Sequence, residues 1–288
     1  MAETGVVLVS WHSGDVLRGA LAALPADLEV VVIDNAAEEG FAKALQAVRP
    51  GVRVIVPGRN LGFGQACNLG AAELGKADIL LLNPDARIDA AGLGCLADAL
   101  GADSRLAAVG PAVQDHSGSW ERTWGADPAF VSEWSERRRG RTTPNRPVGV
   151  RDVPWLSACC LLVRREAWDA VGGFDPGYFL YYEDADLCRR MREEGWRLRL
   201  VPDARAEHIR GVATRALGHR LEWYRRQGQV RYYRRFNGPV DRFLLALRLA
   251  VVLLPRCVAG PEQSFWRALL RRLAGAQSPV ASADAPPG

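Results

Sequence analysis

The first hundred residues alternate between short apolar runs and segments with helical spacing, and this alternation constrains the fold more than any other feature. The apolar runs have the length and composition of strands covered on both faces; they are Gly5–Trp11, Leu28–Ile33, Val52–Val56 and Ile79–Leu82. The helices expected between and after them are Asp15–Leu24, Gly40–Val48, Gly64–Leu74 and Ala90–Leu100. Repeated strand–helix units predict an α/β fold, with a mostly parallel sheet flanked by helices and joined by right-handed crossovers.

The remainder of the chain is less regular. Residues 109–151 are expected to form a loop or short hairpin region over the sheet. The elements expected after it are a strand at 156–163, helices at 165–171 and 184–194, a strand at 196–201, and basic helices from Thr214 onward. We therefore expect an α/β domain over residues 1–212, a basic helical extension over 213–274 and a disordered tail over 275–288.

The 288 residues are 48% hydrophobic and 24% charged, which supplies a large core and excludes a globally disordered chain. The six cysteines have no CxxC spacing, so we expect reduced thiols of a cytoplasmic protein rather than a zinc or disulfide framework. The N-terminus lacks the basic region of a signal peptide. The best apolar stretch, Phe243–Leu254, is shorter than the ~20 residues that cross a bilayer.

Polar residues stand at the ends of four consecutive expected strands. Ser10 ends the first, Asp34 the second, Asn60 follows the third and Asp85 follows the fourth. Ligands of such sheets bind at the carboxyl ends of the strands. Each residue alone is compatible with an ordinary turn, but together they predict a ligand site on one rim of the sheet.

Asp85 closes the sequence Asn83-Pro84-Asp85, directly after an apolar strand. A carboxylate there is a hard oxygen ligand for a divalent cation, which in turn can hold a diphosphate. The alternative is a simple Asn-Pro-Asp turn. His208, which follows the strand at 196–201, is a candidate ligand on the same rim.

Glu183, Asp184 and Asp186 stand together at the start of an expected helix, behind an aromatic-rich loop. The helix dipole stabilises acidic residues at this position, so capping explains part of the cluster. Three carboxylates beside apolar side chains exceed what capping requires. Such crowding raises the pKa of a carboxylate and suits it to accept a proton from a hydroxyl.

Arginine provides almost all of the positive charge, because Lys43 and Lys76 are the only lysines, and the formal net charge is +4. One run is Arg137–Arg139; a second series is Arg225, Arg226, Arg231, Arg234, Arg235 and Arg242. Clustered arginines suit phosphate-rich partners. The plain alternative is a set of solvated helix faces.

Several sequence motifs occur in a fixed order. They are VVLVSWHSGDVL, VVVIDN, NLGFGQACNLG, LLLNPDARI, and the segment from SACCLLV through GGFDPGYFLYYEDADLC to PDARAEHIRG. As a set they resemble glycosyltransferase family 2, most closely its bacterial rhamnosyltransferase-like branch, over residues 5–240.

The resemblance implies a GT-A nucleotide-diphospho-sugar transferase fold, a requirement for Mg²⁺ or Mn²⁺ and an inverting, single-displacement reaction. It assigns residues to the nucleotide-sugar donor, namely Ser10, Asp34, Asn60, Asn68 and Asp85. It assigns Asp184 as the general base with support from Glu183 and Asp186. It implies that Asp85 and His208 hold the metal, and that Trp155 and Ala158 face the acceptor.

The sequence departs from this branch at three places. Ser10-Trp11-His12 stands where Asn-Tyr-Asn is common, Ala158 where Gly is more usual, and Ala36 and Ala37 follow Asp34-Asn35 where a Ser is usual. These changes concern the donor base and the acceptor, and leave the carboxylates intact.

Three other functions compete with this interpretation. A nucleotidyltransferase would need a Gly-rich basic loop after the first strand, but the first cation there is Arg18. A non-catalytic nucleotide-sugar-binding protein would be favoured by loss of the carboxylates, which are all present. A nucleic-acid binder would explain the arginines and interleaved aromatics but not the polar strand ends, so no nucleic-acid partner is expected.

The resemblance points to a dTDP-deoxysugar donor such as dTDP-L-rhamnose, and to an acceptor that is a saccharide or lipid-linked saccharide of a cell-surface polysaccharide. The basic C-terminal helices leave two interpretations open. The stretch Phe243–Leu254 lies on an anionic membrane surface, which would make the protein peripheral to the inner face of the cell membrane, or it packs on the catalytic domain.

Overall fold

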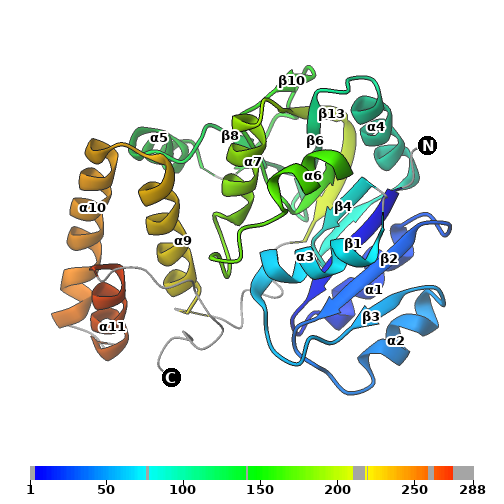
Figure 1. Ribbon diagram of the computed structural model, residues 1–288, viewed down its shortest axis with the longest axis horizontal. Coiled ribbons are helices and arrows are strands. Elements are labelled where there is room, and N and C mark those ends of the chain that lie inside the picture. The colour runs from blue at the N-terminus through cyan, green and yellow to red at the C-terminus, as the bar shows by residue number, and fades with distance from the viewer. Residues whose placement is uncertain are drawn as a thin grey trace.

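The computed structural model describes residues 4–75, 78–140, 142–209, 218, 220–258 and 263–274. A mixed sheet forms its centre, with strand order β10-β13-β6-β12-β4-β1-β2-β3 (Figure 1). The principal strands are β1 (Thr4–Ser10), β2 (Glu29–Asp34), β3 (Arg53–Ile55), β4 (Asp78–Leu82), β6 (Leu106–Asp115), β12 (Cys160–Val163) and β13 (Arg197–His208). The short strands are β5 (Ala86–Ile88), β7 (Trp120–Glu121), β8 (Trp124–Gly125), β9 (Thr142–Thr143), β10 (Arg151–Asp152) and β11 (Trp155–Leu156).

The register of the sheet brings the strand ends to one rim. β1 pairs in parallel with both β2 and β4, and Ser10 at the end of β1 lies directly beside Asp34 at the end of β2. β12 runs antiparallel to its neighbours β4 and β6, while β13 runs parallel to β6. The predicted mostly parallel α/β sheet is therefore confirmed, with one reversed principal strand inserted at its middle.

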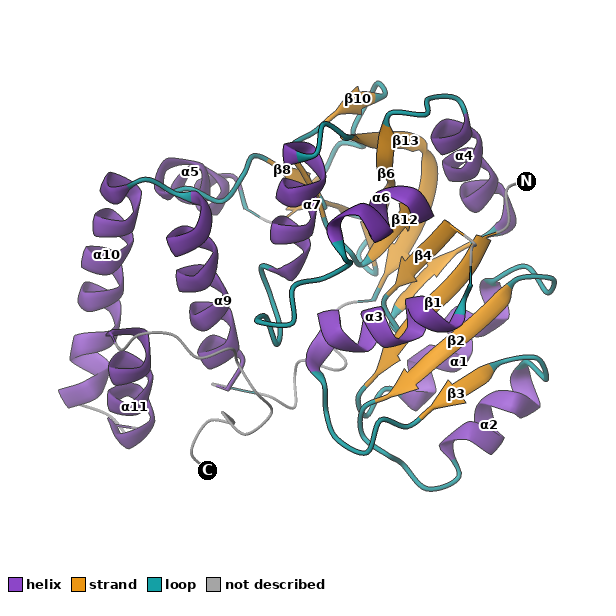
Figure 2. Ribbon diagram, in the orientation of Figure 1, coloured by secondary structure: helices purple, strands orange, loops and turns teal. Residues whose placement is uncertain are grey.

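Helices cover both faces of the sheet (Figure 2). They are α1 (Gly14–Ala23), α2 (Phe41–Val48), α3 (Gly62–Glu73), α4 (Ala90–Gly101), α6 (Arg165–Val171) and α7 (Glu183–Glu193). A further helix, α5 (Phe130–Arg139), lies away from the sheet and buries none of its residues. α1, α2 and α4 bury one apolar cluster with the sheet, and α3, α6 and α7 bury a second. Each strand thus faces apolar side chains on both sides, which explains the continuous apolar runs of the sequence.

A helical part follows the sheet. It consists of α9 (Arg220–Phe236), α10 (Pro239–Val258) and α11 (Gln263–Ala274), and α9 lies between α10 and the α/β part of the chain in Figure 1. A third apolar cluster joins these helices to the loop before α7, because it includes Tyr178 and Ala185 together with Trp223, Tyr232 and Leu253. The extension therefore shares a core with the α/β part.

The structure differs from the sequence expectations between β6 and α7. Residues 130–139 form α5, a helix in a region expected to be loop or hairpin. The strand expected at 156–163 is divided into β11 and β12 by a turn at 157–159. β13 continues through Pro202 to His208, because it pairs with β6 and with β5 on its two sides. The tail at 275–288 and the boundary at 212/213 lie outside the described residues.

Candidate active site

The first part of the site is the rim formed by β1 and β2. Ser10 and Asp34 are almost completely buried. Asp34 accepts hydrogen bonds from the backbone N–H groups of Ala36 (3.0 Å) and Glu38 (2.9 Å), so its carboxylate holds the loop after β2. The Ser10 and Ser13 hydroxyls lie 2.9 Å apart. These two residues shape the rim through the loops that they fix.

Asn60 and Asn35 hold the loop that leads from β3 into α3. The Asn60 side chain accepts from the N–H of Gly62 at 2.8 Å. The Asn35 amide accepts from the N–H of Leu61 (3.2 Å) and donates to the carbonyl of Gly62 (3.0 Å). Gly62 has a φ of 77°, and an added Cβ would lie 2.3 Å from the Phe179 carbonyl oxygen. Asn35 is a member of this rim that the motif assignment did not include.

Asn68 lies away from the rim of β1 and β2 and performs a different task. Its side-chain amide donates to the carbonyl of Phe174 and its carbonyl accepts from the N–H of the same residue, both at 2.8 Å. This two-point contact ties α3 to the loop that precedes α7. Because both ends of the amide are engaged, the structure places Asn68 as a support of the acidic loop rather than beside Ser10, Asp34 and Asn60.

Asp85, His208 and Glu121 form a line of buried polar groups beyond the end of β4. The Nε2 atom of His208 lies 3.1 Å from Asp85 Oδ1, and its Nδ1 atom lies 3.2 Å from Glu121 Oε2. Burial lowers the pKa of His208, but the hydrogen bonds to Asp85 and Glu121 outweigh it and raise the pKa to about 9. Asp85 and His208 are thus brought together as the sequence predicted, and β7 supplies a second carboxylate.

The loop before α7 is held in a strained conformation. Tyr181 and Tyr182 both have a φ of 71°, in the left-handed region that non-glycine residues rarely adopt. Its backbone is clamped from two sides: the Phe179 carbonyl accepts from the N–H of Phe63, and an added Cβ at Gly228 of α9 would lie 2.4 Å from the Tyr181 carbonyl oxygen. The surrounding packing therefore fixes the start of α7.

Asp184 is the partly exposed member of the acidic cluster. Its carboxylate accepts from the backbone N–H of Ala185 at 2.8 Å, with the N–H of Ala158 at 3.5 Å. The indole N–H of Trp155 lies beside it without an aligned hydrogen bond. Burial raises the pKa of Asp184, and these N–H groups hold it below the level that burial alone would give. Trp155 and Ala158, assigned to the acceptor, therefore both border Asp184.

Glu183 is buried and its Oε2 atom has no hydrogen-bond partner among the described residues. Burial and then the negative charge of Asp184 raise the pKa of Glu183 well above its ordinary value. Two adjacent carboxyl groups titrate as a pair, and the more buried and less hydrogen-bonded member retains its proton longer. Glu183 is accordingly the member that keeps its proton to higher pH, and Asp184 ionises first.

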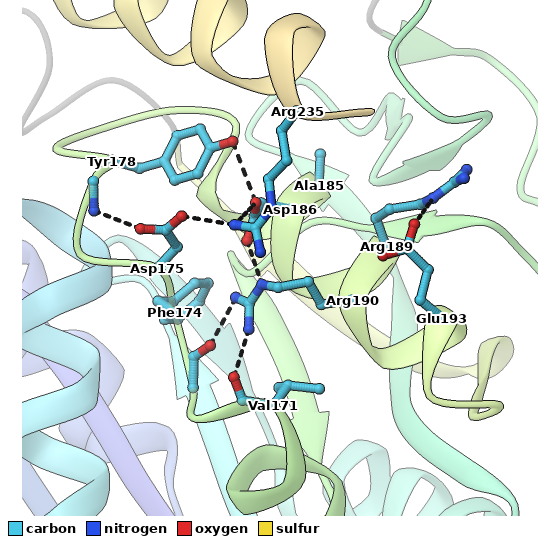
Figure 3. Close-up of polar contacts among 12 residues, drawn as sticks. Val171, Phe174, Asp175, Tyr178, Ala185, Asp186, Arg189, Arg190, Glu193 and Arg235 are labelled. Carbon is cyan, nitrogen blue, oxygen red and sulfur yellow. Dashed lines mark hydrogen bonds and ion pairs between the residues drawn. The ribbon is translucent and has the colours of Figure 1, made fainter. Parts of the chain in front are cut away.

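Asp186 lies in an ion-pair network with arginines (Figure 3). It is completely buried and accepts from Arg190 Nε (2.5 Å), Arg235 Nη1 (3.0 Å) and the Tyr178 hydroxyl (3.3 Å). Arg235 also contacts Asp175, at 2.7 Å. Asp186 therefore joins α7 to the loop before it and to α9, which is a structural task distinct from that of Asp184.

One short turn connects the two halves of the site. The N–H of Asn83, two residues before Asp85, donates to the carbonyl of Cys159 at 2.9 Å. The next residue toward the N-terminus, Ala158, contacts Asp184. The turn at 157–159 thus sets the rim that carries Asp85 and His208 next to the Asp184 carboxylate. The site therefore combines a polar rim on one side with a partly exposed carboxylate of raised pKa on the other.

Sequence reasoning did not identify Glu121. It lies in the two-residue strand β7, within the region expected to be irregular, and its relation to His208 depends on the pairing of β7 with β6. A single glutamate between two tryptophans gives no pattern that would distinguish it. Only the tertiary structure could reveal this contact.

Comparison with known proteins agrees with this geometry. The sequence model for glycosyltransferase like family 2 matches residues 2–229. An N-acetylglucosaminyl-diphospho-decaprenol L-rhamnosyltransferase of Mycobacterium tuberculosis is 33% identical over 235 residues, which cover 73% of this chain and 76% of that protein. The rhamnosyltransferase WbbL of Escherichia coli K12 is 46% identical over 56 residues, 19% of this chain and 21% of WbbL.

Solved structures with low sequence identity share the fold. The mannosyltransferase PcManGT from Pyrobaculum calidifontis, in complex with GDP-Man and Mn²⁺, superposes with a TM-score of 0.54 at 17% identity, over 95% of this chain and 79% of its own. GalNAc-T7 with UDP, GalNAc and Mn²⁺ gives a TM-score of 0.52 at 18% identity, over 73% and 44%. The family match and the fold together establish that this chain belongs to glycosyltransferase family 2 and is a glycosyltransferase with the GT-A fold.

Proposed function

We propose that this glycosyltransferase acts by inversion, with Asp184 as the general base, on a nucleotide-diphosphate sugar and a lipid-linked saccharide acceptor. The observation that supports the mechanism is the position of Asp184: a partly exposed carboxylate of raised pKa, bordered by Trp155 and Ala158, beside the more deeply buried Glu183. The relative from M. tuberculosis, which its name assigns to rhamnosyl transfer onto N-acetylglucosaminyl-diphospho-decaprenol, supports the donor and acceptor classes.

In this mechanism the acceptor hydroxyl attacks the anomeric carbon of the donor while Asp184 accepts the hydroxyl proton. The bond from the anomeric carbon to the diphosphate oxygen breaks, and the nucleoside diphosphate departs with the electron pair. One base on the acceptor side suffices for a single displacement, and no covalent intermediate on the enzyme is required. The Ala185 and Ala158 N–H groups orient the Asp184 carboxylate.

The pair of Asp85 and His208 fits a divalent cation. Asp85 offers a hard carboxylate, and Nε2 of His208 already faces it while Nδ1 is held by Glu121, the arrangement that orients metal-bound histidines. No cluster of three or more potential ligands occurs among the described residues. Two protein ligands suffice for Mg²⁺ or Mn²⁺ when substrate phosphates complete the shell. When bound, such a cation neutralises the charge of the departing diphosphate.

A donor panel tests this assignment together with the role of Glu121. We expect slow hydrolysis of one sugar donor, chosen from dTDP-, UDP- and GDP-sugars, that requires Mn²⁺ or Mg²⁺ and stops with a chelator. Glu121→Gln should raise the Mn²⁺ concentration for half-maximal hydrolysis by about 10- to 100-fold, because it loosens the support of His208. Donor hydrolysis unaffected by chelator would contradict the metal requirement, and an unchanged Mn²⁺ dependence in the variant would contradict the role of Glu121.

The pH dependence follows from the raised pKa of Asp184. The base must be deprotonated to act, so the transfer rate should rise with pH through a pKa above the ordinary ~3.9 of aspartate and then level off. The measurement is kcat against pH at saturating donor, acceptor and metal. If kcat stays at its maximum down to pH values near the ordinary pKa of aspartate, the active base is not a buried carboxylate of the kind seen at Asp184.

We also propose that α10 rests on an anionic membrane surface. Its outer face carries a stripe of apolar residues with 50–73% exposure, namely Val240, Phe243, Leu247, Val251, Leu254 and Val258. The opposite face is buried mainly against the other C-terminal helices, so packing within the protein leaves the outer face of α10 available. Exposed Arg242 and Arg256 complement anionic lipid. In the described part of the chain, no helix has the length and apolarity to cross a bilayer.

Vesicle sedimentation tests the stripe, which we define as the six exposed large apolar residues of α10 named above. Phe243→Gln combined with Leu247→Gln should reduce binding to phosphatidylglycerol vesicles by about tenfold or more, because each exposed side chain contributes apolar burial. Val48→Gln, which changes an exposed valine on α2 at 41% exposure, is the matched control. Equal vesicle binding by all three proteins would refute the membrane contact.

A further inference from the structure

Three arginines from different helices face one another where α5, α9 and α10 meet. Arg137 of α5 is exposed, Arg225 of α9 has a 40% exposed side chain, and Arg248 of α10 has a 17% exposed one. Partial burial and then the positive charges of Arg248 and Arg225 lower the pKa of the Arg137 guanidinium. Glu133 and Glu222 partly offset this effect, and the Arg137 side chain forms no hydrogen bond or ion pair within the described ranges. We refer to Arg137, Arg225 and Arg248 as the arginine cluster.

The charges at this junction do not balance. Glu222 pairs with Arg225 (2.5 Å) and Arg226 (2.7 Å), and Glu133 pairs with Arg248 (3.3 Å). In these ion pairs three guanidinium groups share two carboxylates, and Arg137 adds a fourth positive charge close to them. A sugar-linked lipid diphosphate has one ionised oxygen on each phosphorus and is a suitable anionic partner for such a group of arginines. Guanidinium groups also match the geometry of phosphate oxygens.

The arginine cluster is connected to the catalytic loop. Glu133, the partner of Arg248, also accepts from the Tyr182 hydroxyl at 2.6 Å and from the Gln229 amide at 2.6 Å. Tyr182 is the residue immediately before Glu183 and Asp184 at the start of α7. At its other side, α5 approaches the strand pair β8–β11, since an added Cβ at Gly125 would lie 2.6 Å from Glu136 of α5. α5 therefore contacts the strand pair that includes Trp155 through Glu136, and the helices that carry Arg225 and Arg248 through Glu133.

The apolar stripe lies on the same helix as Arg248. Leu247 and Val251 belong to the stripe and flank Arg248 in sequence, and α10 carries no other charged residue between Arg242 and Arg256. A lipid diphosphate bound at Arg248 would therefore have its phosphate groups next to the edge of an apolar surface. That is the order of groups in a polyprenyl diphosphate sugar: saccharide, diphosphate, hydrocarbon chain.

We propose that the arginine cluster binds the diphosphate of the lipid-linked acceptor and thereby directs its sugar toward Asp184. This inference rests on the proposed function for the acceptor class and adds a binding site to it. Nucleotide-sugar binding is assigned to the opposite side of the site, at the rim of β1 and β2. The arginine cluster is thus a determinant of acceptor specificity and takes no part in the proton transfer.

Acceptor kinetics test the site. Arg137→Gln should raise the KM for a short-chain polyprenyl-diphosphate N-acetylglucosamine by about tenfold, because one charge-assisted contact is lost. The same variant should leave kcat, donor hydrolysis, and the KM for an alkyl glycoside of the same sugar without a diphosphate unchanged. The control is Arg138→Gln, which removes the next arginine in the chain, stacked on Trp134 at 3.8 Å. Equal changes for both acceptors, or in both variants, would overturn the proposal.

A binding measurement separates failure of this site from failure of the proposed function. Farnesyl diphosphate in detergent micelles should bind the wild-type protein, and inorganic diphosphate should compete with it. Binding should weaken in Arg137→Gln and Arg225→Gln but not in Arg138→Gln. These binding measurements involve no sugar transfer. They therefore show whether the arginine cluster binds a lipid diphosphate even if the acceptor of the reaction is misassigned. If Arg137→Gln weakens binding to phosphatidylglycerol vesicles as strongly as binding to farnesyl diphosphate, the cluster recognises headgroups in general and the proposal fails.

Discussion

Asp184→Asn is expected to lower the sugar-transfer rate by about a thousandfold, within the range for removal of a general base. The amide has nearly the same shape as the carboxylate, so it can still accept from the N–H of Ala185 and keep the start of α7 in place. It cannot accept the proton of the acceptor hydroxyl. The measurement is kcat at saturating donor and acceptor, with nucleotide binding and circular dichroism showing that the variant is folded and binds its donor.

Glu183→Gln is the matched comparison for this experiment. The pKa of Glu183 is raised by burial and by the charge of Asp184, so an uncharged amide should replace its carboxyl group with little change in kcat or in the acidic limb of the pH profile. Near-wild-type transfer by Asp184→Asn, or abolished transfer by Glu183→Gln in a folded protein, would contradict the assignment and identify Glu183 as the base in place of Asp184. The adjacent acids are thus distinguished by one pair of variants.

Arg190→Met is expected to reduce the free energy of unfolding by about 3 kcal/mol, the lower end of the range for breaking a buried ion pair. Arg190 contacts Asp186 and also donates to the carbonyls of Val171 and Gly173, both at 2.7 Å. Its loss leaves two carbonyls without this partner and a buried carboxylate with only Arg235 as a cation. Urea unfolding at neutral pH measures the change.

The sign of the pH effect provides a second check on this variant. Burial raises the pKa of Asp186 in the folded protein, and the loss of Arg190 removes a charge that counteracts this rise. At a pH above the ordinary pKa of aspartate, the unfolded chain releases the Asp186 proton while the folded variant still holds it. The stability deficit should therefore grow as the pH rises. Arg189→Met is the control: it removes the neighbouring arginine, 34% exposed and paired with Asp127 and Glu193, and should cost about 1 kcal/mol or less. Equal deficits in both variants would contradict a special role for the buried network.

The sequence predicted the sheet and the rim because both depend on local signals. Apolar runs marked the strands, and the residues at their ends, Ser10, Asp34 and Asp85, lie on one edge wherever parallel strands pair. The pairing of Asp85 with His208 also followed from position, since each comes after a strand. These inferences needed only the order of elements along the chain.

Side-chain direction was beyond the sequence. Asn68 and Asp186 stand within motifs that the family shares, yet one side chain holds the Phe174 backbone and the other lies in an ion-pair network. Helical periodicity indicates which residues share a face, but it does not identify the partner that packs on that face. α5 was missed for a related reason: its residues are mainly polar and none is buried, so it lacks the apolar spacing that marks a helix.

The packing of Gly228 against the Tyr181 carbonyl affects how members of this family can be recombined. A chimaera that exchanges the C-terminal helices to change the acceptor would place a foreign residue against the strained backbone beside Asp184. It would also separate Asp175 and Asp186 from the arginines of α9 that neutralise them. The exchangeable unit is therefore the loop and the helices together, from Gly172 onward, and a crossover at the apparent domain boundary near residue 212 would divide it.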